Sequence, residues 1–131
     1  MTHQLIIIGA GPGGYEVGVK AAKAGLQVLV VEARKLGGTC LNEGCIPTKC
    51  LCKNASLLQE LKEANAFGIE AGEVQFDLSK AIARKDGIVE QLANGIATLM
   101  KTPGITLVQG KAQFIDQHTI EVEGTQYSAP N

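Results

Sequence analysis

Two runs of apolar residues near the start of the chain predict buried parallel strands. One is Leu5–Ile8, which stops at Gly9, and the other is residues 27–31, which stops at Glu32. Uninterrupted runs of this length, rich in β-branched residues, are typical of strands that are covered on both faces. Between them, residues 12–24 carry small side chains at helical spacing. The order strand, helix, strand predicts a right-handed βαβ unit.

Two long amphipathic helices are predicted in the middle of the chain. They follow an irregular, glycine-rich stretch over residues 33–46. Leucine and isoleucine recur every three or four positions over residues 47–64 and again over residues 77–101, which places them on one face of each helix. Asp77 stands where an N-cap is needed, because a carboxylate there accepts free N–H groups of the first turn.

The last third of the chain predicts short strands. Residues 105–109 fit a third strand, and residues 112–115 and 119–122 fit a small antiparallel hairpin. A length of 131 residues suits one domain. We therefore expect a single domain over residues 1–131 of the α/β class: a Rossmann-like parallel sheet with a βαβ unit, helices on both faces and a small antiparallel hairpin.

Composition and charge exclude several classes of protein. Lys and Arg number 12 against 13 Asp and Glu, so the net charge of −1 offers no electrostatic footprint for nucleic acid or an anionic membrane. Hydrophobic residues make up 45% of the chain and charged ones 19%, as in a soluble globular protein. No apolar run approaches the length of a membrane span, and the first residues do not resemble a signal peptide. These features predict a cytoplasmic protein.

Three of the 16 glycines form a dinucleotide-binding pattern between the first strand and the first helix. Gly9 permits the tight turn out of the strand, Gly11 lets the backbone approach a pyrophosphate, and Gly14 lets the helix pack closely. The phosphates are expected at the helix N-terminus, where N–H groups face them. Glu32, at the end of the second strand, can accept both hydroxyls of an adenosine ribose. This pattern does not separate FAD from NAD.

All four cysteines lie within thirteen residues, at positions 40, 45, 50 and 52. In a chain without an export signal, such clustering favours redox chemistry or a metal over structural disulfides. The spacings fit neither the usual zinc pairs nor iron–sulfur runs, so no metal site is expected. Cys50 and Cys52 are interpreted as inert buried thiols.

Cys40 and Cys45 need an irregular backbone if they are to pair. In a regular helix their Cα atoms would lie about 8.7 Å apart, whereas a disulfide needs roughly 4.4–6.8 Å. Gly44 supplies the necessary freedom. Cys45 then precedes a helix that starts near Pro47, whose dipole stabilises a thiolate. Lys49 lies one helical turn beyond Cys45 and places a cation on about the same face.

Two segments carry a resemblance to a known family. The sequence from Gly37 to Lys49, GGTCLNEGCIPTK, closely resembles the redox-disulfide segment of the pyridine nucleotide-disulfide oxidoreductases. The sequence from Gly9 to Tyr15, GAGPGGY, is similar to their FAD-binding turn, and the resemblance extends over the whole chain. Leu41, Ile46 and Thr48 favour the members that oxidise dihydrolipoamide over glutathione reductase and mercuric reductase.

The resemblance implies an FAD-binding portion with a redox-active disulfide. Cys40 would exchange with the dithiol substrate, Cys45 would be the sulfur nearest the flavin, and Lys49 would lie near the flavin ring. Electrons would pass from dihydrolipoamide to the disulfide, then to FAD and finally to NAD+. The residues implied at the cofactor are Gly9, Gly11, Pro12 and Gly14 at the pyrophosphate, Glu32 at the ribose, Gly38, Thr39, Cys40 and Lys49 along the cofactor, and Ala112 at the adenine.

Members of this family are several-fold longer than 131 residues. They continue into an NAD domain and an interface domain, which supplies a His–Glu pair from the other subunit of a homodimer. The chain is therefore expected to represent the N-terminal FAD-binding portion, catalytically incomplete alone. For the parent enzyme, the implied partners are the lipoyl domains of 2-oxoacid dehydrogenase or glycine cleavage complexes. The alternatives are another member of the family such as glutathione or mercuric reductase, a non-catalytic dinucleotide-binding module with incidental cysteines, or a structural fragment that binds nothing.

Overall fold

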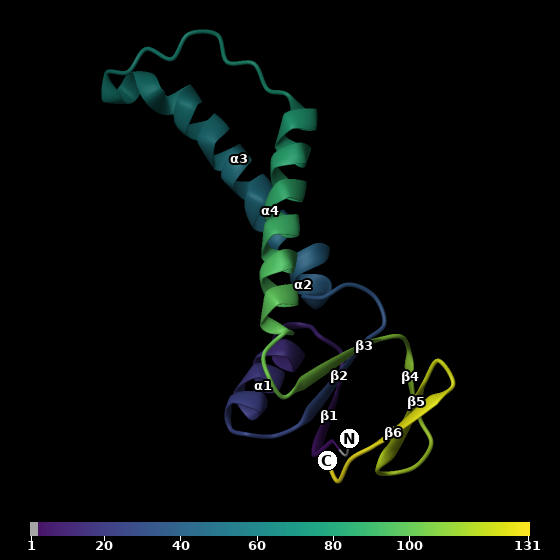
Figure 1. The fold of residues 1–131 in the computed structure, drawn as a ribbon. Coiled ribbons are helices and arrows are strands. Elements are labelled where there is room, and N and C mark those ends of the chain that lie inside the picture. Colours follow the sequence, from purple (N-terminus) through teal and green to yellow (C-terminus); the bar gives the residue numbers. More distant parts are fainter. Residues whose placement is uncertain (1–2) are drawn as a thin grey trace.

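A three-stranded parallel sheet forms the base of the molecule. The computed structural model describes residues 3–131. Strands β1 (Leu5–Ile8), β2 (Val28–Glu32) and β3 (Ile105–Gln109) lie in the order β1-β2-β3, and both pairings are parallel (Figure 1). All five residues of β2 are buried, as the continuous apolar run predicted for a central strand.

Helices cover one face of this sheet. Helix α1 (Pro12–Lys23) connects β1 to β2, which confirms the predicted βαβ unit. Since side chains alternate along a strand, Val28 and Val30 point to this face. They share a buried cluster with residues of α1 and of the C-terminal end of α4 (Leu78–Leu99). The buried members of this cluster are Ala10, Ala22, Val28, Val30, Leu41, Ile96 and Met100.

A second, antiparallel sheet covers the opposite face. It consists of β4 (Ala112–Phe114), β5 (Thr119–Val122) and β6 (Thr125–Ser128). Ile120 and Val122 of β5 pack against Leu29 and Val31 of β2, and all four side chains are at most 2% exposed. The predicted fold class is confirmed, but the structure differs from the prediction of helices on both faces. The second face receives a sheet because β5 alternates apolar and polar residues and buries its apolar side there.

The antiparallel sheet also has one strand more than the predicted hairpin. Strand β6 contains Thr125, Gln126, Tyr127 and Ser128, whose composition resembles a loop. Its connection to β5 is a tight turn in which Glu123 and Gly124 both have positive φ, 47° and 80°. Two such residues match the twist of neighbouring strands, and this turn pairs β6 with β5.

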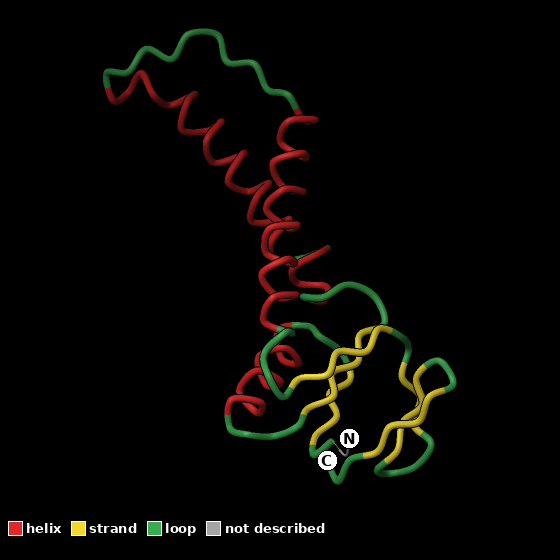
Figure 2. Tube along the Cα trace, in the orientation of Figure 1, coloured by secondary structure: helices red, strands yellow, loops and turns green. Residues whose placement is uncertain are grey.

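Two long helices form an arm that projects from the sheets (Figures 1 and 2). Helix α3 (Cys45–Glu63) continues into a short 3₁₀ helix, η1 (Ala64–Phe67), and packs against α4, which returns to the core. As predicted, Asp77 caps α4: its carboxylate accepts the backbone N–H groups of Ser79 and Lys80 at 2.9 and 3.3 Å. Within residues 3–131, no helix is both long and apolar enough to cross a membrane.

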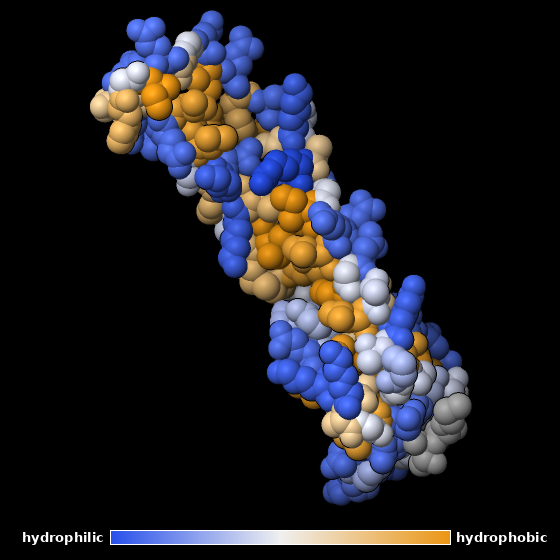
Figure 3. Space-filling model, turned by 60° about the vertical axis from the view of Figure 1, so that its left-hand side comes forward, coloured by the Kyte–Doolittle hydropathy of each residue, from blue (hydrophilic) through white to orange (hydrophobic). Residues whose placement is uncertain are grey.

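The arm exposes more apolar surface than the predicted stripes suggested. Figure 3 shows apolar side chains on the surface along its length. The large apolar residues exposed there are Leu51, Leu57, Phe67, Ile69, Val74, Phe76, Leu78, Leu92 and Leu99. The arm reaches the core of the sheet region at its base, through Ile46 at the start of α3, Ile96 near the end of α4 and Met100 just after it.

A short helix, α2 (Gly38–Asn42), occupies part of the segment that was expected to be irregular. It lies between β2 and α3 and ends at Asn42; Glu43 is its C-cap, and Gly44 is the N-cap of α3. Five residues are too few to show helical periodicity, which explains why the sequence pattern did not indicate it. This helix carries Cys40, one of the two cysteines of the predicted redox pair.

Candidate functional site

The glycine-rich turn between β1 and α1 leaves the N-terminal end of α1 free of protein caps. Gly11 is the N-cap residue, and among the described residues no side chain caps the helix there. Pro12 occupies the first turn, which contains no acidic residue. The free N–H groups and the positive end of the helix dipole are therefore available to an anion such as a pyrophosphate.

Backbone conformation explains Gly9 of this turn, and close packing explains Gly14. Gly9 has φ of +101°, and its N–H donates to the carbonyl oxygen of Val31 at 2.7 Å. A Cβ atom on Gly14 would lie 1.8 Å from the carbonyl oxygen of Gly9, so no other residue fits without moving the backbone. Gly14 thus brings α1 close to β1, which is the role that the pattern predicted.

A second glycine pair touches this turn from the redox segment. The N–H of Gly37 donates to the carbonyl oxygen of Ala10 at 2.8 Å. Gly38 has φ of +64°, and a Cβ atom there would lie 2.9 Å from the Cα atom of Gly11. The backbone that precedes Cys40 therefore lies directly against the dinucleotide-binding turn.

Glu32 is a buried carboxylate that the backbone holds in place. It is 8% exposed, and its Oε2 accepts the N–H of Ala10 at 2.8 Å while Oε1 accepts the N–H of Arg34 at 2.7 Å. Each carboxylate oxygen can accept a second hydrogen bond. Glu32 thus keeps acceptor capacity for the two hydroxyl groups of a ribose.

A cavity of about 420 Å³ opens beside Glu32. It lies at the carboxyl end of β2, the edge at which parallel α/β sheets bind their ligands. Its volume falls within the usual range for small-molecule sites, roughly 300–1,000 Å³. The lining residues are Glu32, Arg34, Lys35, Gly38, Thr39, Asn42 and Glu43.

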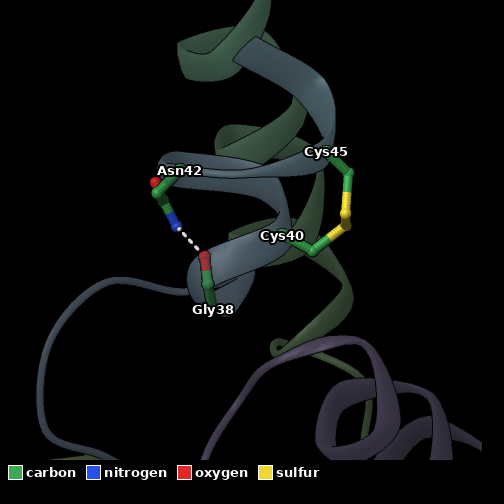
Figure 4. Close-up of a disulfide and its surroundings, with 4 residues drawn as sticks. All are labelled: Gly38, Cys40, Asn42 and Cys45. Carbon is green, nitrogen blue, oxygen red and sulfur yellow. Dashed lines mark hydrogen bonds between the residues drawn. A yellow bond between two sulfur atoms is a disulfide. The ribbon is translucent and has the colours of Figure 1, made fainter. Parts of the chain in front are cut away.

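Cys40 and Cys45 form a disulfide (Figure 4). It joins α2 to the first residue of α3, and the two Cα atoms are 4.6 Å apart, within the range that a disulfide requires. The irregular backbone that this distance demands is found at Gly44, with φ of −125° and ψ of −101°. Cys45 is exposed and Cys40 is half-buried, so a small thiol can reach the pair.

The remaining lysine and cysteines of the segment lie along α3. Lys49 is exposed one turn beyond Cys45. Cys50 is buried, as expected for a packed thiol, whereas the expectation of burial is wrong for Cys52, which is exposed because it lies on the other side of α3. In the described part of the chain, no group of three or more His, Cys, Asp or Glu residues could hold a metal ion.

Ala112 lies apart from the cavity. It pairs with Val122 at the start of β4 and packs against the cluster between the two sheets. The chain comes closer at Gly110, whose N–H donates to the carbonyl oxygen of Glu32 at 2.9 Å. A contact of Ala112 with an adenine ring stays a prediction.

Four residues that line the cavity were not identified from the sequence: Arg34, Lys35, Asn42 and Glu43. Arg34 and Glu43 form an exposed ion pair, with 2.6 Å between Nη2 and Oε1. The side-chain amide of Asn42 donates to two backbone carbonyls. The available signal for Asn42 was its residue type, because asparagine next to a glycine-rich turn commonly bonds to nearby backbone.

Comparison with known proteins places these features in one family. A family model described as pyridine nucleotide-disulphide oxidoreductase matches residues 3–131. A dihydrolipoyl dehydrogenase of Bacillus subtilis is 48% identical over 122 residues, which cover 92% of this chain and 27% of the relative. A dihydrolipoyl dehydrogenase of Thermus scotoductus is 46% identical over 128 residues, which cover 98% of this chain and 28% of the relative.

A solved structure has the same arrangement of elements. The HOCl-induced flavoprotein disulfide reductase RclA from Escherichia coli is 33% identical and superimposes with a TM-score of 0.80. The match covers 97% of this chain and 26% of that protein. The chain thus spans about a quarter of the length of each of these three similar proteins.

Proposed function

The chain belongs to the pyridine nucleotide-disulphide oxidoreductase family, and we propose that it is the FAD-binding, redox-disulfide portion of an enzyme that oxidises dihydrolipoamide with NAD+ as the final acceptor. The observation that carries this proposal is the position of the Cys40–Cys45 disulfide. It follows a backbone segment that touches the dinucleotide-binding turn, at Gly38 and Gly11. The segment that carries the reducible sulfur pair therefore lies against the turn that we assign to the nucleotide.

The residues of the site fit FAD. Gly11 and Gly38 meet without any side chain between them, which leaves room for a cofactor beside the turn. No side chain caps the N-terminal end of α1, and each carboxylate oxygen of Glu32 can accept one more hydrogen bond. On this proposal Gly9, Gly11, Pro12 and Gly14 hold the pyrophosphate and Glu32 holds the ribose. The cofactor then passes along four further residues, Gly38, Thr39, Cys40 and Lys49, and its adenine contacts Ala112. FAD, when bound, supplies a two-electron acceptor beside the cysteine pair.

The disulfide receives electrons by thiol–disulfide exchange. A thiolate of the dihydrolipoyl substrate attacks Sγ of Cys40, the bond between the cysteine sulfurs breaks, and its electron pair leaves on Sγ of Cys45. That sulfur lies at the N-terminal end of α3, where N–H groups stabilise a thiolate. The second substrate thiol then attacks the substrate sulfur of the mixed disulfide and releases Cys40. The substrate leaves as a cyclic disulfide, and the cysteines have gained its two electrons and two protons.

The division of roles between the two cysteines rests on the family resemblance and on the helix end next to Cys45. Lys49, one turn further on α3, adds a positive charge near that end. We assign Cys40 to exchange with substrate and Cys45 to contact with the flavin. Substituting each cysteine separately distinguishes these assignments.

The wider setting of the chain is also part of this proposal. Residues 1–131 act as one domain of a cytoplasmic homodimer, whose partners are the lipoyl domains of 2-oxoacid dehydrogenase or glycine cleavage complexes. Because the chain spans 27–28% of the two dihydrolipoyl dehydrogenases, we expect no complete catalytic cycle from it alone.

Visible spectroscopy of the purified chain with added FAD tests the proposal. We expect bound flavin and, after two-electron reduction, a long-wavelength band from a thiolate in contact with the flavin. Cys45→Ser should lack that band, and the exposed control Cys52→Ser should leave the spectrum unchanged. Cys40→Ser should show the band without any reduction, because its Cys45 is already a free thiol and the flavin is still oxidised. Bound flavin without the band, with all cysteines intact, would support a non-catalytic dinucleotide module. Failure to bind FAD would contradict the cofactor assignment.

A further inference from the structure

Asn42 lies between the two cysteines in the sequence, and its side chain forms hydrogen bonds with the backbone that precedes Cys40. Its Nδ2 donates to the carbonyl oxygen of Leu36 at 3.0 Å and to that of Gly38 at 2.8 Å. Figure 4 shows the second of these bonds on the side of α2 away from the disulfide. An amide group has two hydrogens, so Asn42 uses its full donor capacity on this backbone.

Helix α2 depends on such contacts because it is short. It has five residues, begins after Gly37 at φ of +94°, and no side chain in residues 3–131 caps its N-terminal end. A single turn of helix is unstable in isolation. The ion pair between Arg34 and Glu43 lies on the surface, where such pairs contribute little. The two bonds from Asn42 therefore add a side-chain link between the end of α2, its start and the loop before it, beside the backbone bond from the N–H of Glu43 to the carbonyl oxygen of Thr39.

The same bonds connect the sulfur pair to the nucleotide turn. Asn42 holds the carbonyl of Gly38, whose Cα lies against Gly11, while the neighbouring Gly37 donates to Ala10 at 2.8 Å. Asn42 does not touch the disulfide; it acts on Cys40 through the backbone of α2. Its effect on chemistry is therefore one of position.

We propose that Asn42 is a positioning residue that keeps Cys40 close to Cys45 after the disulfide has opened. The inference rests on the proposed redox role of the pair. Reduction adds two electrons and two protons and converts the disulfide to two thiols, while two glutathione thiols become one glutathione disulfide. In the oxidised chain the covalent bond restrains residues 40–45. In the dithiol chain Asn42 supplies the restraint.

This restraint has a definite effect on the redox equilibrium. Without Asn42, the dithiol segment gains conformational freedom that the disulfide-bonded segment cannot gain. The dithiol is then favoured, and the effective concentration of one thiol at the other falls. One hydrogen bond changes an equilibrium constant by roughly two- to tenfold. For two bonds we expect about a tenfold loss in the constant for disulfide formation, equivalent to a potential about 30 mV less negative.

Equilibration of the 131-residue chain in glutathione buffers measures this constant. Free thiols are alkylated after quenching, and the peptide that contains Cys40 and Cys45 is quantified by mass spectrometry. Asn42→Ala removes the N–H donors of the side-chain amide. Asn42→Asp keeps the shape of the side chain but places a carboxylate oxygen against the carbonyl oxygens of Leu36 and Gly38, so neither hydrogen bond can form. Both variants should lower the constant about tenfold, whereas Asn94→Ala, an exposed asparagine of α4, should not change it.

A constant unchanged within about twofold in both Asn42 variants, with native circular dichroism, would overturn the proposal. If the variants do not fold, hydrogen exchange of the unmodified chain gives a second test. The N–H of Glu43 donates to the carbonyl of Thr39 at 2.9 Å, and its protection should survive reduction. Loss of that protection in the dithiol form would also overturn the proposal.

The same titration separates this inference from the proposed function. If the Cys40–Cys45 pair does not interconvert with glutathione at all, the proposed redox function fails. If the pair interconverts normally but the Asn42 variants match the unmodified chain, only the role of Asn42 fails.

Discussion

Replacement of Gly38 by alanine tests the contact between the two glycine segments. Gly38 has φ of +64°, and an added Cβ would lie 2.9 Å from the Cα atom of Gly11. That neighbour is backbone, so it cannot rotate away as the end of a side chain would. The substitution therefore strains the conformation of residue 38 and also pushes the redox segment off the dinucleotide-binding turn.

The size of the effect follows from these two costs. A residue other than glycine in the left-handed region costs roughly 1–2 kcal/mol, and overpacking a close contact typically costs about 1–3 kcal/mol. We expect Gly38→Ala to lower the free energy of unfolding by about 2–5 kcal/mol. Gly68→Ala is the matched control because Gly68 has φ of +74° but nothing within 4 Å of an added Cβ. The control carries the conformational cost alone.

Urea unfolding followed by circular dichroism measures both free energies. The difference between the two variants isolates the contact with Gly11. FAD titration of the folded Gly38→Ala chain should also show weaker binding than the Gly68→Ala chain. Equal stability losses in the two variants, together with equal FAD affinity, would refute the argument that the segments are in tight contact.

Two further substitutions test Glu32 and Asp77. Glu32→Gln can place an amide hydrogen against the N–H of Ala10, and an unsatisfied buried donor costs about 1–3 kcal/mol. We therefore expect a lower free energy of unfolding in urea and weaker FAD binding. Unchanged values for both would contradict the assigned position of this carboxylate. Hydrogen bonds from the Ser79 side chain and then from the backbone hold the pKa of Asp77 below its ordinary value of 3.8 in the folded chain. The stability gained from this lowered pKa is fully present above pH 3.8 and is lost as the pH falls through the folded-state pKa. Asp77→Asn should therefore reduce the melting temperature more at pH 6 than at pH 3, and a reduction that does not change with pH would contradict the cause given for the shift.

Local patterns were sufficient to predict the parts of the fold that depend on neighbouring residues. The strand from Leu5 to Ile8 and the central strand β2 follow from uninterrupted apolar runs, and α1 follows from the order of these elements. The cap at Asp77 follows from residue type and position. Helix α2 could not be recognised because one turn has no period, and β6 could not because its residues are mostly polar.

The candidate site divides in the same way. The need for glycine at positions 9 and 14, and for an irregular backbone between Cys40 and Cys45, arises within short stretches of chain, whereas the nearest neighbour of Gly11 is Gly38, in a later segment. The role of Asn42 could not be predicted, because its two acceptors are defined only once the chain turns back before α2. The exposure of Cys52 likewise depends on which side of α3 meets α4.

The amino-acid sequence by itself determined the βαβ unit, the glycine-rich turn between β1 and α1 and the position of the cysteine pair, because apolar runs, turn glycines and spacing act over a few residues. Only the tertiary structure decided that Gly38 meets Gly11, that an antiparallel sheet covers the second face of β2, and that Glu32 is held by two N–H groups. Among these features, the cluster between the two sheets joins Leu29 to Val122, 93 residues further along the chain. They are stabilised by packing and hydrogen bonds that form only once distant segments have folded against β2.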